Sequence, residues 1–205
     1  MSKRASQGQL VILTIGHSTR SIKDFLNLLQ AHGVKRLVDV RTVPRSRHNP
    51  QFNRERLARA LSHAGIGYTH MAELGGLRHA RRDSPNTGWR NASFRGFADY
   101  MQTPEFETCL GKLIKSAART QVAIMCAEAV PWRCHRSLIA DALVVRGIKV
   151  EHVTSATHAQ PHSLTTFAKV EGTRIAYPSE MLPLEFTEAR IGQGEDRAVQ
   201  PEASR

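Results

Sequence analysis

The 205-residue chain is 40% hydrophobic and contains no run of 18 apolar residues, which excludes a disordered protein and a membrane-spanning one and indicates one globular domain. Its three cysteines, an odd number in a chain of this length, exclude a disulfide framework. The formal net charge of +11 favours contact with phosphates or nucleic acids. Because the basic N-terminus lacks the apolar segment of a signal peptide, we expect a cytoplasmic protein with no membrane contact.

Short apolar runs alternate with amphipathic segments along the chain. They predict a strand over 10–15, a helix between Ser21 and Gly33, a strand over 36–41, a helix between Asn53 and Gly65, and a weaker strand over 66–71. Further along come a helix over 104–118 capped by Thr103, a strand over 121–126, a helix over about 134–146 and a strand over 148–153. Strands that alternate with helices pair in parallel, so the predicted fold is a single α/β domain with a mainly parallel sheet flanked by helices.

The predicted domain spans residues 8–155, and a polar C-terminal extension spans residues 156–205. Within the extension, residues 174–178 form a possible short strand, and we expect disorder from about residue 188. The segment 77–97 is too long for a plain connection between strand and helix. It interleaves basic residues with aromatic ones, a composition that suits either contact with a ligand or a flap packed on the domain.

Charged and polar residues follow most of the predicted strands. Because the carboxyl ends of parallel strands meet at one edge of the sheet, where ligands bind in open α/β folds, we expect these residues to form one site. We further expect His17, Arg41, Glu128 and Arg136 to share one pocket. The predicted site residues are His17, Ser18, Arg41, Arg45, Glu128, Arg133, Cys134, His135 and Arg136.

Anion binding is the chemistry that most of these residues favour. Arginine forks bind phosphate bidentately, and backbone N–H groups near a helix start can hold an anion. Only two acids, Asp39 and Glu128, stand among four arginines, so a bound phosphate, sulfate or nucleotide should balance the remaining charge. Asp39 is expected to pair with Arg41 or another arginine, and the arginines are expected to add little to the core. The predicted anion-binding residues are Ser18, Arg41, Arg45, Arg133, His135 and Arg136.

Three residues are candidates for catalysis: Glu128, His17 and Cys134. An acid among arginines and histidines is either an ion-pair partner or a general acid/base. Cys134 is predicted to lie at a helix start among basic residues, which lowers a thiol pKa, although packing is an alternative. For Cys126, at the end of an apolar strand, packing is favoured. The Cys-x7-Cys-His spacing matches no strong zinc pattern, so we expect no metal, and no other cofactor is predicted.

Five motifs follow one another between residues 10 and 153: Thr14-Ile15-Gly16-His17-Ser18, Asp39-Val40-Arg41 with Pro44 and Ser46, Leu74-Gly75-Gly76, Cys126-x-Glu128, and Cys134-His135-Arg136. In these motifs and in their order, the chain resembles the domain-of-unknown-function 488 family. The resemblance implies a compact α/β domain with a shared polar site. It implies no particular reaction.

Three functions compete. The leading hypothesis is an enzyme that acts on a phosphorylated or nucleotide-like substrate, and the alternative is a non-catalytic nucleic-acid-binding module. A Cys-dependent phosphatase or sulfurtransferase with Cys126 as nucleophile is less favoured. Its pattern is similar to that of rhodanese-type domains, but the loop from Cys126 to Arg133 is one residue too long, and Glu128 would repel an anionic substrate.

Overall fold

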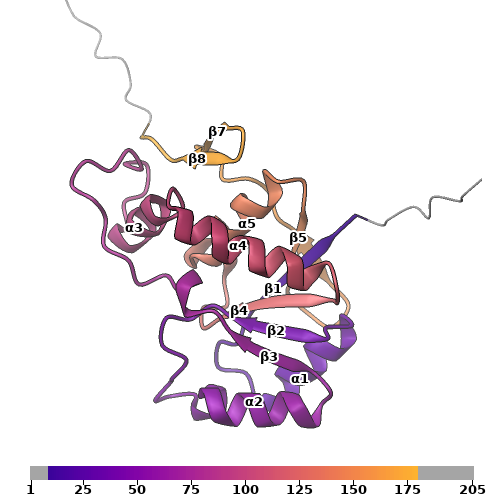
Figure 1. Cartoon of the computed structure of the whole chain (residues 1–205). Helices are drawn as coiled ribbons and strands as arrows, with labels where there is room; N and C mark the ends of the chain where they lie inside the picture. The colour runs from indigo at the N-terminus through magenta and orange to yellow at the C-terminus, as the bar shows by residue number, and fades with distance from the viewer. Residues whose placement is uncertain (1–8, 180–205) are drawn as a thin grey trace, which may run out of the picture.

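The computed structural model describes residues 9–179, and its centre is a six-stranded sheet in the order β3-β2-β4-β1-β5-β6 (Figure 1). Five strands pair in parallel. They are β1 (Val11–Gly16), β2 (Arg36–Asp39), β3 (Gly67–His70), β4 (Val122–Cys126) and β5 (Lys149–Val153). The sixth, β6 (Ala159–Pro161), is antiparallel to β5. The predicted α/β class with a mainly parallel sheet is therefore confirmed.

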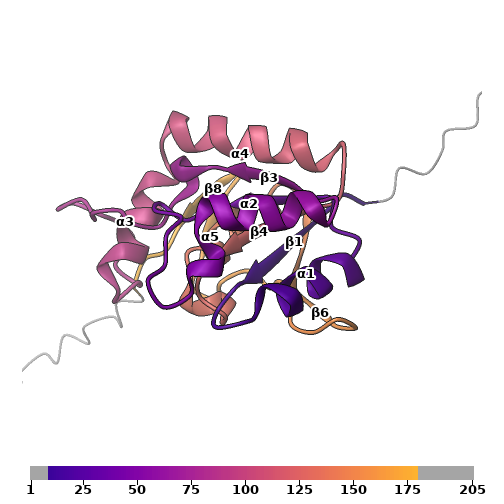
Figure 2. The ribbon, with the colours of Figure 1, turned by 90° about the horizontal axis from the view of Figure 1, so that it is seen from below.

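Helices cover both faces of the sheet (Figures 1 and 2). One face carries α1 (Ile22–Ala31) and α2 (Arg54–His63), and the other carries α3 (Ala92–Tyr100), α4 (Pro104–Ala117) and α5 (Arg136–Val144). Neighbouring residues of β1 belong to different cores: Leu13 belongs to the core that contains Phe25 of α1, whereas Ile12 belongs to the core that contains Leu110 of α4. Because side chains alternate across a strand, a continuous apolar run can supply both cores.

The predicted helix ends are recognisable in the backbone. The Ser21 side chain accepts a hydrogen bond from the N–H of Asp24, and Thr103 accepts one from that of Phe106. Gly65, after α2, has a φ of 70°, which favours glycine. Asn53 lies at the predicted start of α2, but its side chain does not cap the helix. It accepts instead from the N–H of Ser46 at 2.7 Å and holds the loop after β2.

Two segments contain regular structure outside the main alternation of strands and helices. The segment 77–97 contains the beginning of α3, and the region after β5 contains a hairpin of β7 (Lys169–Glu171) and β8 (Arg174–Ala176). The β8 strand lies within the short strand predicted over 174–178. Trp89 packs against Phe94 and Phe167 with ring centroids 4.9 Å apart, and it also contacts the buried ring of Tyr177. These aromatic rings therefore form a flap packed on the domain. The predicted disorder from residue 188 lies outside the described residues.

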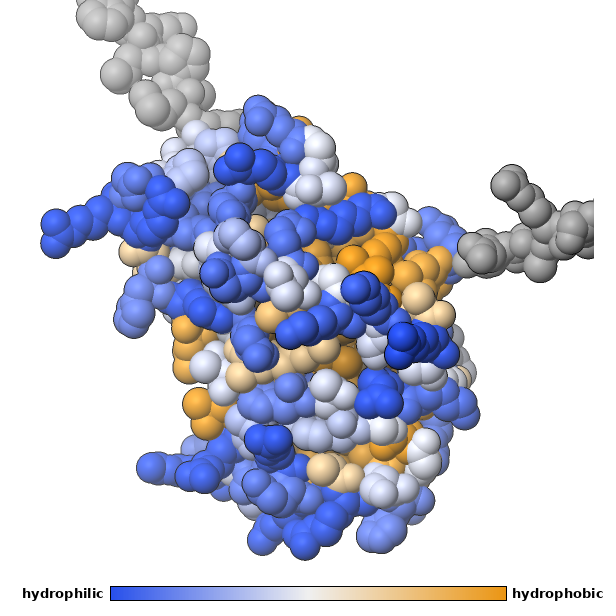
Figure 3. All heavy atoms as spheres, in the orientation of Figure 1, coloured by the Kyte–Doolittle hydropathy of each residue, from blue (hydrophilic) through white to orange (hydrophobic). Residues whose placement is uncertain are grey.

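Three short 3₁₀ helices complete the described chain: η1 (Pro50–Phe52), η2 (Ala72–Leu74) and η3 (Pro131–Arg133). Because η3 precedes α5, the last long helix begins at Arg136, two residues later than predicted. Hydrophilic side chains cover much of the face in Figure 3, with hydrophobic atoms visible between them. No helix in the described part of the chain is long and apolar enough to cross a membrane.

Candidate functional site

A cavity of about 360 Å³ lies where β2 and β4 end. Its walls come from the loop after β2, the segment around Gly76, the start of α3 and the loop between β4 and α5. Six predicted site residues line it: Arg41, Arg45, Glu128, Arg133, Cys134 and His135. The fold thus brings together side chains from four separate stretches of sequence at the carboxyl edge of the sheet, where ligands bind in such folds.

The other predicted residues, His17, Ser18 and Arg136, do not line this cavity. The backbone N–H groups of His17 and Ser18 donate to the carbonyls of Cys126 and Ala127 at 3.0 and 2.9 Å. These two groups are therefore occupied within the protein and do not form the anion cradle expected from the sequence. Of the four residues expected in one pocket, only Arg41 and Glu128 face it.

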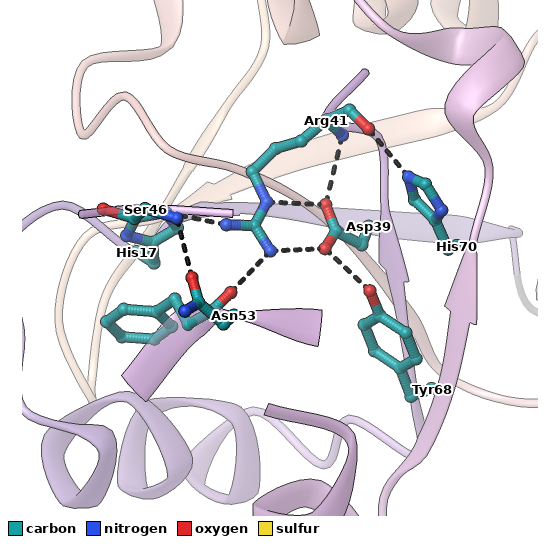
Figure 4. A network of polar contacts seen from close by, with 8 residues as sticks. His17, Asp39, Arg41, Ser46, Asn53, Tyr68 and His70 are labelled. Atoms are coloured by element: carbon teal, nitrogen blue, oxygen red, sulfur yellow. Dashed lines mark hydrogen bonds and ion pairs between the residues drawn. The ribbon is translucent and has the colours of Figure 1, made fainter. Parts of the chain in front are cut away.

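Arg41 and Asp39 form a buried bidentate ion pair (Figure 4). The Nε and Nη2 atoms of Arg41 donate to the two carboxylate oxygens of Asp39 at 2.9 and 2.6 Å. Tyr68 also donates to Asp39, at 2.9 Å, and burial together with the nearby carboxylate raises the pKa of Tyr68. Asp39 is fully buried, so the expected pairing of these two residues is a structural feature at the floor of the site.

His17 fixes the free end of Arg41. Its Nδ1 donates to the Ser18 carbonyl at 2.8 Å, which leaves Nε2 to accept from Nη1 of Arg41 at 3.3 Å. The imidazole also stacks on Phe52, with centroids 4.2 Å apart. Burial is the main cause that lowers the pKa of His17 to about 4, and Arg41 adds to the effect. A neutral His17 engaged in this way positions Arg41 and does not face a substrate in the cavity.

Arg136 holds the loop between β4 and α5 against the sheet. Its Nη2 donates to the Glu128 carbonyl at 2.5 Å, and its Nη1 donates to Oγ1 of Thr14 at 3.2 Å. Only 1% of Arg136 is exposed, and its Nε has no partner among the described residues. The expectation that the site arginines add little to the core is therefore wrong for Arg41 and Arg136, because both are buried and extensively hydrogen-bonded.

Two cysteines and a histidine meet at the back of the cavity. The Sγ atom of Cys134 lies 3.7 Å from Nδ1 of His135, whose Nε2 donates to the Val40 carbonyl at 3.2 Å. The neighbouring Cys126 thiol, together with His135, lowers the pKa of Cys134, and the Cys134 thiol together with burial raises the pKa of Cys126. Cys126 lines the cavity as well as ending β4, so packing alone does not describe its position.

Two glycines allow the loops around the cavity to approach closely, and the sequence alone does not show why these positions need glycine. A Cβ atom on Gly76 would lie 2.5 Å from Nδ1 of His135. One on Gly16 would lie 1.9 Å from the Glu128 carbonyl oxygen. Both are far shorter than a normal contact, so these positions require glycine for the loops to approach.

Arg45 and Arg133 are the two arginines that remain open to a ligand. Both are exposed, both line the cavity, and neither forms an ion pair within residues 9–179. Glu128 lines the same cavity, and one of its carboxylate oxygens lies 3.4 Å from the N–H of Val130. The cavity therefore combines two available cations with one carboxylate and the thiol–imidazole cluster.

The model of the family described as Domain of unknown function DUF488 matches residues 21–143. The chain belongs to this family. The match includes β2, β4 and the loop that carries Glu128 and Cys134, and it begins after His17 and Ser18. No curated protein and no solved structure matches the chain. The family description states no activity, so the activity has to be argued from the site.

Behind the cavity, this DUF488 chain contains a line of hydrogen bonds that the sequence did not indicate. His152 Nδ1 accepts from Thr14 Oγ1 at 2.7 Å, and its Nε2 lies 2.9 Å from Nδ1 of His162. His162 Nε2 donates to Asp141 at 2.8 Å. With both imidazoles neutral, the hydrogen bonds run in one direction: Arg136 donates to Thr14, Thr14 to His152, His152 to His162, and His162 to Asp141. His162 follows the last predicted strand, in a region where the sequence shows only a polar pattern.

The DUF488 chain should lose stability at acidic pH because His152, in this line of hydrogen bonds, resists protonation in the folded protein. Burial, followed by His162 and Arg136, lowers the pKa of His152 from 6.5 to about 4, while Asp141 opposes the shift. The unfolded chain therefore takes up a proton at His152 before the folded chain does. We expect the free energy of unfolding to fall between about pH 6.5 and pH 4, by roughly 2 kcal/mol for this residue.

An NMR titration of the histidine ring protons tests this expectation, because it reads the protonation of His152 directly. His152 should remain neutral in the folded protein at about pH 5. A titration of the His152 ring centred near its ordinary pKa would contradict it. The variant His152→Gln should show a weaker dependence of stability on pH over the same interval.

Proposed function

We propose that this DUF488 protein is an enzyme that binds a phosphate-bearing small molecule, such as a nucleotide, in the cavity between β2 and β4. The observation that carries the proposal is the pairing of two available arginines, Arg45 and Arg133, at one cavity that also holds a carboxylate and a thiol–imidazole cluster. Arginine binds phosphate through a fork of donors. A cytoplasmic location, expected from the sequence, is part of this proposal.

The charges in the cavity favour an anionic ligand. Arg41 is neutralised by Asp39, so it adds little to the local field. Arg133 directly precedes Cys134 and enters the cavity from η3, whereas Arg45 enters from the loop after β2. The ligand phosphate would lie between these two side chains, close to the reactive groups.

The remaining lining residues suit hydrolysis or group transfer. Glu128 would exchange a proton with the substrate as a general acid/base. His135, whose Nε2 is fixed on the Val40 carbonyl, presents Nδ1 to the two thiols and keeps a defined orientation. His17, which the sequence placed among the catalytic candidates, acts through Arg41 as a positioning residue.

Thermal unfolding at low salt tests the proposal. Inorganic phosphate, a nucleoside monophosphate and a nucleoside triphosphate should each be added at increasing concentration. A ligand present at about a hundred times its Kd stabilises the fold by about 2.7 kcal/mol, which raises Tm by several degrees. The double variant Arg45→Gln with Arg133→Gln should lose this shift. Without ligand, its Tm should equal that of the natural protein, because both side chains are exposed.

The matched control is Arg56→Gln, an exposed arginine on α2 that does not line the cavity. It should respond to the ligands as the natural protein does. No shift with any phosphate compound at low salt, or an undiminished shift in the double variant, would contradict the proposal.

The non-catalytic nucleic-acid-binding alternative makes a different prediction for salt. Binding through many phosphate contacts weakens steeply as salt rises, since counterions are released from the polyanion. A small ligand held by Arg45 and Arg133 makes few such contacts, so its affinity should change modestly. Tight binding of an oligonucleotide that disappears with added salt, without any nucleotide binding, would favour the alternative.

A further inference from the structure

We infer that Cys126, Cys134 and His135 form a binding site for one thiophilic divalent metal ion, with zinc as the expected occupant. The two Sγ atoms and one imidazole nitrogen all lie within 4.8 Å of one another. Two thiolates and one imidazole are a ligand set that zinc uses in catalytic sites. The inference goes beyond the proposed function, because a metal would be present whether or not a phosphate compound binds.

The spacing of these atoms fits a tetrahedral ion. Zinc–sulfur bonds of about 2.3 Å and zinc–nitrogen bonds of about 2.0–2.1 Å place neighbouring sulfur and nitrogen ligands roughly 3.5 Å apart. The distance from Cys134 Sγ to His135 Nδ1 is 3.7 Å. For this pair a bound ion requires a shift of only a few tenths of an ångström, and the other pairs of ligand atoms lie within 4.8 Å.

The surroundings of His135 match those of a metal ligand. A histidine that binds a metal through one nitrogen usually donates a hydrogen bond from the other to a carbonyl or carboxylate. His135 donates from Nε2 to the Val40 carbonyl at 3.2 Å, which leaves Nδ1 as the acceptor that faces the sulfur atoms. Gly76 lies against the same ring, where a larger residue would displace it.

The site has three protein ligands and borders a cavity. Structural zinc sites are closed by four protein ligands, whereas catalytic sites keep one position for water or substrate. Cys126, Cys134 and His135 all line the cavity that Glu128 also lines, so the fourth position would face that space. Two thiolates would neutralise the charge of the ion. These features are those of a catalytic site.

The sequence predicted no metal because the Cys-x7-Cys-His spacing fits no common zinc motif. The fold supplies the proximity that the spacing does not. Cys126 ends β4, while Cys134 and His135 begin the turn into α5. Arg136 holds the intervening loop against the sheet through the Glu128 carbonyl, so it brings the two ends of the loop together.

Metal content of the untagged, purified chain tests the inference. Elemental analysis should find about one zinc per chain. When the metal is removed and Co²⁺ is added, an absorption band from thiolate-to-cobalt charge transfer should appear. Cys134→Ser should greatly weaken both signals, and so should Cys126→Ser. Cys109→Ser is the matched control: Cys109 is a buried cysteine on α4 that lies outside the cluster, so both signals should persist.

Two results would overturn the inference. One is the absence of both zinc and any cobalt–thiolate band in the natural protein, a measurement that does not depend on the variants folding. The other is a folded Cys134→Ser protein, verified by circular dichroism, that binds Co²⁺ with an unchanged spectrum. Because neither readout uses a substrate, failure of the metal site leaves the phosphate-binding proposal separately testable.

Discussion

Replacing Asp39 with alanine is expected to lower the free energy of unfolding by about 3–5 kcal/mol, since the change leaves a buried charge without its partner. Arg41 is only 6% exposed and Asp39 is fully buried, so the guanidinium left behind is poorly solvated. The variant also removes the acceptor for Tyr68. Urea unfolding followed by circular dichroism measures the effect.

The matched control for Asp39→Ala is Asp83→Ala. Asp83 pairs with Arg81 at a similar distance, 2.8 Å, but on the surface, with side chains 75% and 58% exposed. Such exposed pairs contribute at most about 1 kcal/mol. Equal losses in the two variants would show that the Asp39 pair is not buried as described. The double variant Asp39→Ala with Arg41→Met should recover part of the loss, because no buried charge then remains.

The substitution Gly16→Ala is expected to destabilise the protein by roughly 2–3 kcal/mol or more, through overpacking at a backbone contact. The new Cβ would meet the carbonyl oxygen of Glu128 at 1.9 Å and the Cα of Ala129 at 2.8 Å. Because backbone atoms cannot rotate away, the loop after β4 must move from the end of β1. That movement separates Arg136 from the Glu128 carbonyl and disturbs the cavity wall.

Gly111→Ala serves as the control for this prediction. Gly111 lies within α4, and a Cβ built there meets nothing within 4 Å. Alanine favours a helix interior over glycine by up to about 1 kcal/mol, so this variant should be unchanged or slightly more stable. The account of Gly16 would be wrong if Gly16→Ala had the stability of the natural protein and kept its ligand binding.

The fold was predictable because its signals are local. The apolar runs that became β1 and β4 supply both cores of the sheet, and Ser21, Thr103 and Gly65 mark helix ends by their own backbone chemistry. For the site, the sequence predicted the location, at the carboxyl ends of the parallel strands, but not the contacts of each side chain. Parallel pairing brings Arg41 and Glu128 to one edge, and that follows from the order of elements.

What a side chain does at that edge depends on long-range contacts, which no local pattern encodes. Arg41 and Arg45 are four residues apart in one loop, yet one is buried against Asp39 and the other is open to the cavity. The requirement for Gly16 arises from Glu128, more than a hundred residues away in the chain. The line through Thr14 and His152 likewise needs β1 and β5 to be neighbours.

NMR mapping of backbone amides can locate the proposed binding of a phosphate-bearing ligand in the cavity between β2 and β4. Addition of a nucleoside monophosphate should shift the amide signals of Gly76, Arg133 and His135, which line the cavity. The other candidate location is a basic groove at the opposite end of the strands, lined by Lys35, Lys112, Lys115 and Arg119. Shifts gathered at the cavity are the predicted result, and shifts confined to the basic groove, or none at saturating ligand, would contradict the account.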